Sequence, residues 1–337
     1  MKNISAFLVL VTILCLPALA QEAENDGAFN RKESGYAVSI TPQFGMLYGQ
    51  AEEIVYPTDT KGEMMSQLLW DLKPLFYYGL SMELSPAKAA ERWGFFSVLS
   101  LKTGIPGITG VMEDRDWLSI ENGELTHYSI HDNETREMLW LDFSAGFSFP
   151  LPPLFIFKAF AGVSYMRFSF SGWDGHGTYA LEDPPNSYIY KPITESPLEY
   201  DFSGKVINYT QRWLLVAPGL SLSFRFLGFF SFDLAFQISP LIFCNDLDEH
   251  LSTTVQTQYR DYMSGGIFLE PRGGFTFTAT EWLSLQFEFA WRYIDGSRGT
   301  IYSKTYGDAV GNYGLGLSDS GAGLSVMDAR ILFKVQL

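Results

Sequence analysis

An alternating pattern of apolar and polar residues indicates the fold most clearly in 136–149, Arg136-Glu137-Met138-Leu139-Trp140-Leu141-Asp142-Phe143-Ser144-Ala145-Gly146-Phe147-Ser148-Phe149. Side chains of an extended chain point to opposite faces at successive positions, so residues two apart share a face. One face of this stretch is apolar and consists of Leu139, Leu141, Phe143, Ala145, Phe147 and Phe149. The next residues, Pro150-Leu151-Pro152-Pro153, cannot continue a hydrogen-bonded ladder. The pattern predicts a strand that ends in a tight turn.

Similar alternation recurs along the chain and predicts about ten strands. The other segments are 36–49, 66–84, 93–103, 155–171, 208–226, 229–244, 259–278, 283–295 and 324–337. Four connections between them are short, near 85–92, 150–154, 227–228 and 279–282. The others are long and polar, near 50–65, 104–135, 172–207, 245–258 and 296–323. Short turns on one side and long loops on the other are typical of a bacterial outer-membrane barrel.

Composition agrees with a transmembrane antiparallel β-barrel. Aromatic residues make up 16% of the chain, and Gly occurs 31 times. In such barrels apolar side chains face lipid at every second position, while small or polar ones face the lumen. A soluble β-sandwich is the alternative, but its strands would be shorter. The formal net charge of -15 argues against a nucleic-acid partner.

The first 20 residues are predicted to be a secretory signal peptide. Lys2 supplies a positive start, residues 4–16 form a short apolar core, and Ala18-Leu19-Ala20 is a small-x-small cleavage signal. Residues 21–337 are then expected to form a single barrel domain outside the cytoplasm. This mature chain keeps one cysteine, Cys244, so it cannot form an intrachain disulfide.

Two acidic stretches in the predicted long loops are candidates for chemistry. In Asp246-Leu247-Asp248-Glu249-His250, an extended backbone places Asp246, Asp248 and His250 on one face. A carboxylate beside an imidazole can accept its ring proton, fix its tautomer and raise its basicity. A solvated acidic loop with a chance histidine is the simpler interpretation of this stretch alone.

The second stretch, Met112 to Trp117, contains Asp114 and Asp116, which are also two apart. Two carboxylates facing an Asp–His pair across a cleft could hold a water, with the histidine as its base. No Cys or His metal-ligand spacing and no glycine-rich phosphate loop accompanies them. We therefore expect no metal and no cofactor.

The sequence resembles the omptins, a family of outer-membrane aspartyl-type endopeptidases built as ten-stranded barrels. Five segments in the same order carry the resemblance: 47–56 (LYGQAEEIVY), 66–70 (SQLLW), 112–117 (MEDRDW), 209–213 (YTQRW) and 246–250 (DLDEH). The resemblance implies that Asp114 and Asp116 are the catalytic aspartate pair and that Asp248 and His250 are the Asp–His dyad. It also implies a pocket for a basic substrate side chain, lined by Glu53 and Asp246.

The resemblance extends in part to a lipopolysaccharide-binding patch on the outer wall. The patch's basic positions correspond to Arg167, Arg212 and Arg260, but Val163 and Tyr165 replace its tyrosine and glutamate. The resemblance therefore allows lipopolysaccharide as an activating lipid without requiring it.

These features predict an outer-membrane endopeptidase that cleaves polypeptides, mainly cationic ones, next to Arg or Lys, with its active site facing the cell exterior. Two other classes stay open: a catalytically idle barrel acting as an adhesin or surface receptor, and a porin. A Ser–His nucleophile built from Ser129 with His127 or His131 is a further alternative. It is disfavoured because a triad also needs an oriented third group and an oxyanion hole.

Overall fold

The computed structural model describes residues 35–57, 64–89, 91–118, 123–151, 154–185, 189–195, 197–252, 256–305 and 313–337. The predicted signal peptide lies outside the described residues. From Tyr36 to Leu337 the chain forms one compact unit. No helix among the described residues is long and apolar enough to cross a membrane.

The described unit consists of thirteen strands, and all their pairings are antiparallel. The strands are β1 (Tyr36–Pro57), β2 (Ser66–Pro86), β3 (Gly94–Gly104), β4 (Gly107–Asp116), β5 (His127–Leu151), β6 (Phe155–Tyr179), β7 (Leu198–Phe226), β8 (Phe230–Ser239), β9 (Ile242–His250), β10 (Thr257–Ser264), β11 (Ile267–Thr278), β12 (Leu283–Thr305) and β13 (Gly314–Gln336).

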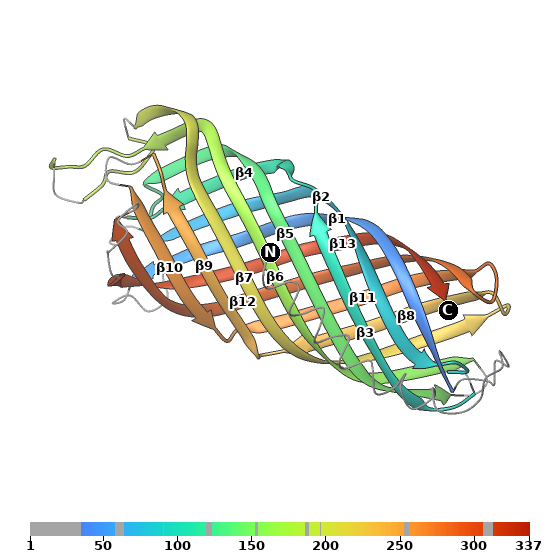
Figure 1. Cartoon of the computed structure of the whole chain (residues 1–337). Coiled ribbons are helices and arrows are strands. Elements are labelled where there is room, and N and C mark those ends of the chain that lie inside the picture. The colour runs from blue at the N-terminus through green and yellow to red at the C-terminus, as the bar shows by residue number, and fades with distance from the viewer. Residues whose placement is uncertain are drawn as a thin grey trace. The chain divides into compact units, whose positions relative to one another are not determined.

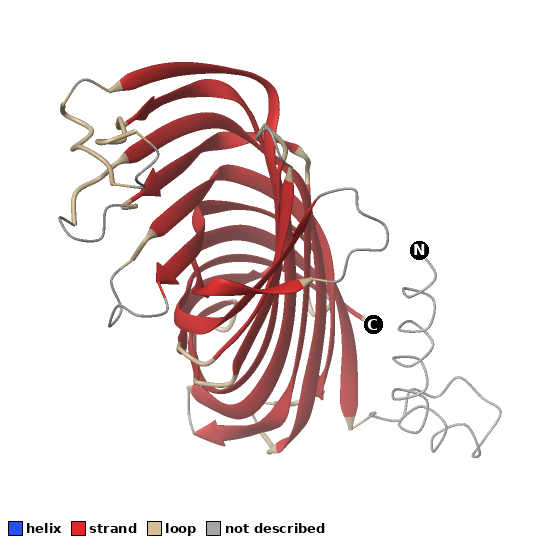
Figure 2. Ribbon diagram, turned by 90° about the vertical axis from the view of Figure 1, so that its left-hand side faces the viewer, coloured by secondary structure: helices blue, strands red, loops and turns tan. Residues whose placement is uncertain are grey.

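These strands close into a barrel, because β1 pairs with β13 and the remaining strands pair in sequence around the ring (Figures 1 and 2). Three places in the ring each hold two short strands, β3 with β4, β8 with β9, and β10 with β11. Thirteen strands therefore fill ten places, which confirms the predicted strand number. Because β1 pairs with β13, the described strands leave no long sheet edge with unpaired backbone groups.

One of the breaks between short strands depends on glycine. Gly265 and Gly266 join β10 to β11 with φ values of 81° and 88°. A side chain is strained in this left-handed region, whereas glycine adopts it at no steric cost. A Cβ at Gly266 would also lie 2.2 Å from the carbonyl oxygen of Asp295. The two glycines thus let one ring place change direction without a long loop.

The outer wall carries the apolar face that the sequence predicted. On β5, Phe143, Phe147 and Phe149 are exposed, whereas Met138 and Trp140 on the opposite face are buried in the barrel. The same exposure recurs on the neighbouring strands, including Phe76, Tyr78 and Leu80 on β2 and Phe232, Leu234, Phe236 and Ile238 on β8. An apolar belt around a closed barrel is the surface that faces lipid.

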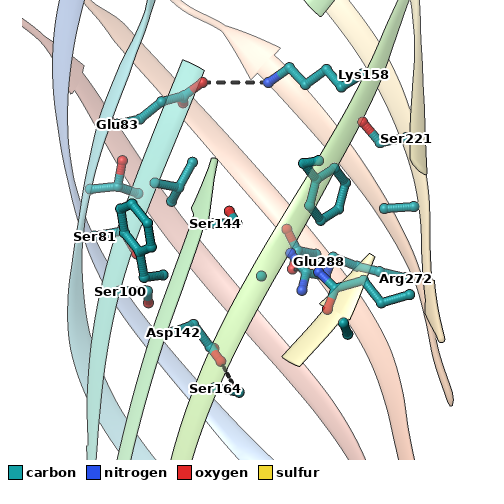
Figure 3. A pocket seen from close by; sticks show the side chains of 18 of the residues that line it. Ser81, Glu83, Ser100, Asp142, Ser144, Lys158, Ser164, Ser221, Arg272 and Glu288 are labelled. Carbon is teal, nitrogen blue, oxygen red and sulfur yellow. Dashed lines mark hydrogen bonds and ion pairs between the residues drawn. The ribbon is translucent and has the colours of Figure 1, made fainter. Parts of the chain in front are cut away.

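Inside this belt, the lumen contains paired charges. Lys102 Nζ lies 2.9 Å from Asp328 Oδ2 and 4.0 Å from the ring centre of Trp140. Arg292 pairs with Glu270, and each of these four charged side chains is at most 3% exposed. A cavity of about 240 Å³ lies next to this network. Its lining includes Ser100, Asp142, Ser164, Arg272 and Glu288 (Figure 3). A porin needs a water-filled channel, so buried ion pairs in the lumen argue against that alternative.

The strands continue beyond the lipid-facing belt on the side away from the short turns. Parts of all five segments predicted as long loops are therefore strand in the structure. In 104–135 and 245–258 these parts are β4, the start of β5, most of β9 and the start of β10. These extensions were predicted as loops because both faces of each strand meet polar surroundings there. Alternation of apolar residues is then not required, and the sequence does not show it. The candidate catalytic residues lie on these strand extensions.

Candidate active site

The four predicted catalytic residues lie near the ends of two strands that face each other across the lumen. Asp114 and Asp116 are on β4, and Asp248 and His250 are on β9. Strands β5, β6 and β7 separate β4 from β9 in the ring, so the two pairs come from different walls of the barrel. The structure brings them close enough for His250 to influence the pKa values of both Asp114 and Asp116.

Strand alternation holds each pair toward the lumen, as the spacing predicted. On β4, the outward residues Glu113 and Arg115 form an ion pair with each other. On β9, outward Glu249 accepts hydrogen bonds from Asn208 at 3.1 Å and from Gln258 at 2.8 Å. Glu113 and Glu249 therefore lie on the outward faces of their strands and do not compete with Asp248 for His250.

Asp248 and His250 form a direct contact. His250 Nε2 lies 2.5 Å from Asp248 Oδ2, and the side chain of Asp248 is 4% exposed against 35% for His250. Burial alone would lower the pKa of His250, but the charge of Asp248, and further those of Asp114 and Asp116, raise it to about 9. An imidazole so placed is a stronger base than a free histidine and is oriented by a buried carboxylate.

The aspartate pair holds protons more tightly than ordinary carboxyl groups. Burial, followed by the charge of Asp116, raises the pKa of Asp114 well above its usual value. Burial also raises the pKa of Asp116, while Ser66 and His250 act in the opposite direction. Two like charges in a poorly hydrated site disfavour double ionisation, so such a pair tends to retain a proton.

The two predicted pocket residues also meet. Glu53 on β1 and Asp246 on β9 are 4% and 1% exposed, and the Tyr209 hydroxyl donates to Asp246 Oδ2 at 2.9 Å. Burial raises the pKa of Asp246 to about 7, with Asp248 adding to the effect and the Tyr209 hydrogen bond opposing it. Burial and the surrounding acids likewise raise the pKa of Glu53 well above its usual value. The pocket is therefore a buried acidic site in which neither Glu53 nor Asp246 forms an ion pair with a described residue.

Two residues near the site were not anticipated from the sequence. Asp261 on β10 pairs in register with Asp246, and ligand oxygens of Asp261, Asp246 and Glu53 all lie within 4.8 Å of one another. Tyr179, at the end of β6, borders the aspartate pair: burial and then the charge of Asp114 raise its pKa to about 12. Only the strand register, which no local motif encodes, could have pointed to either residue.

The alternative Ser–His pair also forms a contact. His131 Nε2 lies 2.9 Å from Ser129 Oγ, and both residues are buried. The other ring nitrogen of His131, Nδ1, contacts the backbone carbonyl oxygen of Asp174, so the third partner is a carbonyl and not a carboxylate. His127 instead packs against the ring of Tyr179, with ring centres 4.6 Å apart. The described contacts thus give Ser129 a hydrogen-bond partner but no acidic third member of a triad.

Of the three predicted lipid-binding arginines, two are neighbours. Arg167 and Arg212 pair in register between β6 and β7. Arg167 contacts Glu137 at 3.3 Å, and Arg212 donates to Asn245 Oδ1 at 3.3 Å. Arg260 lies on β10 with its guanidinium 4.9 Å from the ring centre of Tyr313. A lipid role for these three residues stays a prediction.

Comparison with known proteins identifies the family of this chain. The model of the omptin family matches residues 34–330. The chain belongs to the omptin family. It is 25% identical over 330 residues to the plasminogen activator of Yersinia pestis, and the alignment covers 92% of each protein. It is 24% identical over 288 residues to protease 7 of Escherichia coli strain K12, which covers 83% of each.

A solved structure of an omptin has the same fold. The crystal structure of the outer membrane protease OmpT from Escherichia coli matches with a TM-score of 0.76 and 19% sequence identity. The match covers 91% of this chain and 100% of that one. This likeness confirms the predicted all-β transmembrane barrel.

Proposed function

We propose that this omptin is an outer-membrane endopeptidase that hydrolyses polypeptides next to Arg or Lys at the cell surface. Its similarity to a plasminogen activator and to protease 7 supports peptide-bond hydrolysis. The observation that carries the proposal is the Asp248–His250 contact of 2.5 Å, which lies across the lumen from a second acid pair. An adhesin has no need for this arrangement.

In the proposed mechanism, a water held between the two pairs is the nucleophile. His250 removes a proton from the water as its oxygen attacks the scissile carbonyl carbon. Asp248 orients the ring and stabilises the imidazolium that forms. The proton then passes to the amide nitrogen as the C–N bond breaks. Asp114 also binds a proton tightly, so one proton can reside on the aspartate pair. That proton removes part of the negative charge that raises the pKa of His250, and the neutral imidazole then acts as the base.

The preference for a basic side chain follows from Glu53 and Asp246. Each has a buried carboxylate oxygen with no hydrogen-bond partner among the described residues. Arg or Lys would supply charge-assisted hydrogen bonds, and Arg can do so in bidentate fashion. A neutral side chain would leave these carboxylates dehydrated and without a counter-charge, which costs more than the lost contact.

The proposed setting is the bacterial outer membrane, with the site at the end of the barrel opposite the short turns. Short turns of outer-membrane barrels face the periplasm, so the site would face the exterior. Arg167 and Arg212 beside the lipid belt could bind phosphate groups of lipopolysaccharide, and Arg260 could assist them. We propose this lipid as a possible activator; no cofactor or metal enters the proposed reaction.

The direct test uses refolded protein in detergent with fluorogenic peptides that differ only in the residue before the scissile bond. We expect cleavage with Arg or Lys and strong loss with Ala or Glu, with and without added lipopolysaccharide. Product masses would identify the cleaved bond. Equal cleavage of the Arg and Ala peptides would refute the pocket assignment, and a folded barrel that cleaves none of them would favour the adhesin alternative.

A further inference from the structure

The acidic group formed by Glu53, Asp246 and Asp261 contains one carboxylate more than a basic side chain needs. Asp261 on β10 lies directly across the strand pair from Asp246, and Glu53 reaches them from β1. The exposures of Asp261, Asp246 and Glu53 are 2%, 1% and 4%. If all three ionise, the pocket holds three negative charges in a space that water hardly enters.

Each of these acids keeps one buried oxygen without a hydrogen-bond partner among the described residues: Glu53 Oε2, Asp246 Oδ1 and Asp261 Oδ1. The three residues can also offer ligand oxygens that all lie within 4.8 Å of one another. A buried carboxylate oxygen without a donor is costly, so three of them in one place indicate a missing cationic partner. The buried hydroxyl of Ser320 lies beside Asp261 and adds a fourth oxygen.

We infer that Glu53, Asp246 and Asp261 form a binding site for a divalent cation of the size of Ca²⁺. Carboxylate and hydroxyl oxygens are the ligands such hard cations prefer. Ca²⁺ binds oxygens at about 2.3–2.6 Å, so ligands on opposite sides of one ion lie about 4.6–5.2 Å apart. The spacing of the three acids falls within that limit. Mg²⁺ requires shorter bonds and a stricter octahedron and gives up its waters reluctantly, so we expect it to bind more weakly than Ca²⁺.

Charge balance also favours a divalent ion over a basic side chain as the sole occupant. One Arg or Lys leaves two of three negative charges uncompensated, whereas a divalent ion leaves one. The ion would occupy the place that the proposed function gives to the substrate's basic side chain, so the two should compete. That competition rests on the proposed function, but binding of the ion does not.

Luminescence of Tb³⁺, a stand-in for Ca²⁺, tests binding without any need for catalysis. Tyr209 donates to Asp246, and Trp70 stacks on Tyr209 with ring centres 5.4 Å apart, so both rings could transfer excitation energy to the ion. The experiment uses the folded full barrel in detergent without lipopolysaccharide, which itself binds divalent cations. We expect saturable Tb³⁺ emission that Ca²⁺ displaces more effectively than Mg²⁺.

Three variants locate the ion. Asp261→Asn should weaken Tb³⁺ binding at least about tenfold because it removes one charged ligand. Asp261→Glu should restore part of it, and the exposed Asp319→Asn should bind like the unmutated protein. Gel mobility before and after heating checks that each variant is folded. Loss of emission in Asp114→Asn but not in Asp261→Asn would place the ion at the catalytic acids and overturn the assignment; so would emission that Ca²⁺ fails to displace.

A kinetic experiment then tests the competition. Ca²⁺ should raise KM for an Arg peptide and leave kcat unchanged in the unmutated protein, and this effect should weaken in Asp261→Asn. If Tb³⁺ and Ca²⁺ bind but no peptide is cleaved, the cation site stands and the proposed function fails. If peptides are cleaved but neither ion binds, the proposed function stands and the cation site is refuted.

Discussion

The lumen of this barrel has two regions that differ in whether their buried acids form ion pairs with Arg or Lys. Within the lipid-facing belt, Glu270, Glu288 and Asp328 each lie against Arg or Lys side chains. Beyond the belt, no described Arg or Lys forms an ion pair with the acids of the cleft, and Asp248 has His250 as its basic partner. Among the described residues, the buried carboxylate oxygens without a hydrogen-bond partner belong to Glu53, Asp114, Asp246, Asp248 and Asp261, which all lie in the cleft.

The ion-paired charges of the belt stabilise the fold, whereas the acids of the cleft are available to bind a ligand. A paired charge inside the belt is neutralised by the protein itself, and removing one partner leaves the other buried and uncompensated. An unpaired acid in the cleft destabilises the folded chain until a proton, a substrate or an ion neutralises it. Substitutions in the two regions should therefore have opposite consequences, and the following predictions test this contrast.

The largest effect is expected on catalysis in the cleft. Asp114→Ala and His250→Ala should each lower kcat/KM for an Arg peptide roughly 10²–10⁴-fold, because each removes a principal acid–base group. The barrel should still fold, as shown by β-rich circular dichroism and by heat-dependent gel mobility. Ser129→Ala is the matched control, since Ser129 is buried nearby but is not the proposed nucleophile. Trapping an acyl-enzyme on Ser129 would contradict this assignment.

In the belt, the large effect should be on stability. Arg292→Ala leaves Glu270 buried with less compensation, and breaking a buried ion pair costs about 3–5 kcal/mol of unfolding free energy. Urea titration of the refolded barrel would measure this loss. Cleavage per folded molecule should stay close to that of the unmutated protein, because Arg292 is distant from the proposed chemistry. A variant as stable as the unmutated protein would show that the belt pairs do not support the fold.

Specificity should respond to the pocket acids. Asp246→Asn should reduce the preference for Arg over Ala by about 1–3 kcal/mol, or roughly 5–150-fold, since one charge-assisted partner is lost. The ratio of kcat/KM values for the two peptides measures the effect. The exposed Glu199→Gln serves as a control that also removes one negative charge from the chain. An equal change in both variants would mean that net charge, and not the pocket, sets the preference.

The pH dependence of cleavage should identify the role of Asp248. Its negative charge raises the pKa of His250 against the effect of burial. Asp248→Asn should therefore move the pH limb assigned to His250 toward lower pH, and Asp248→Glu should partly restore it. The profile of kcat/KM against pH would show the shift. An unchanged limb in Asp248→Asn would assign it to another group.

The smallest effect concerns stability of the cleft. Asp246 has a folded-state pKa of about 7, above the usual value of an aspartate, so the folded chain binds more protons than the unfolded chain between about pH 4 and 7. The unfolding free energy should fall as pH rises through that window, and Asp246→Asn should make the dependence shallower. Urea titrations at several pH values would measure it. A steeper dependence in the variant would contradict the contrast between the two regions.

The barrel fold could be predicted from the sequence. Alternation in 136–149 and its counterparts depends only on the geometry of an extended chain, so the lipid-facing and lumen-facing residues could be assigned without a structure. The same local rule placed Asp114 with Asp116 and Asp248 with His250 on single faces. It said less about strand length, because polar strands above the lipid belt lack an apolar face.

Tertiary structure alone decided which faces meet. Asp114 and His250 are far apart in sequence and approach only because the ring closes with β5, β6 and β7 between their strands. The register of β9 with β10 likewise sets Asp261 against Asp246 and creates the third carboxylate of the acidic group. Register depends on hydrogen bonds and packing summed over whole strands, and a shift of one residue would turn Asp261 to the other face. No single motif encodes that sum, so only the folded barrel could reveal it.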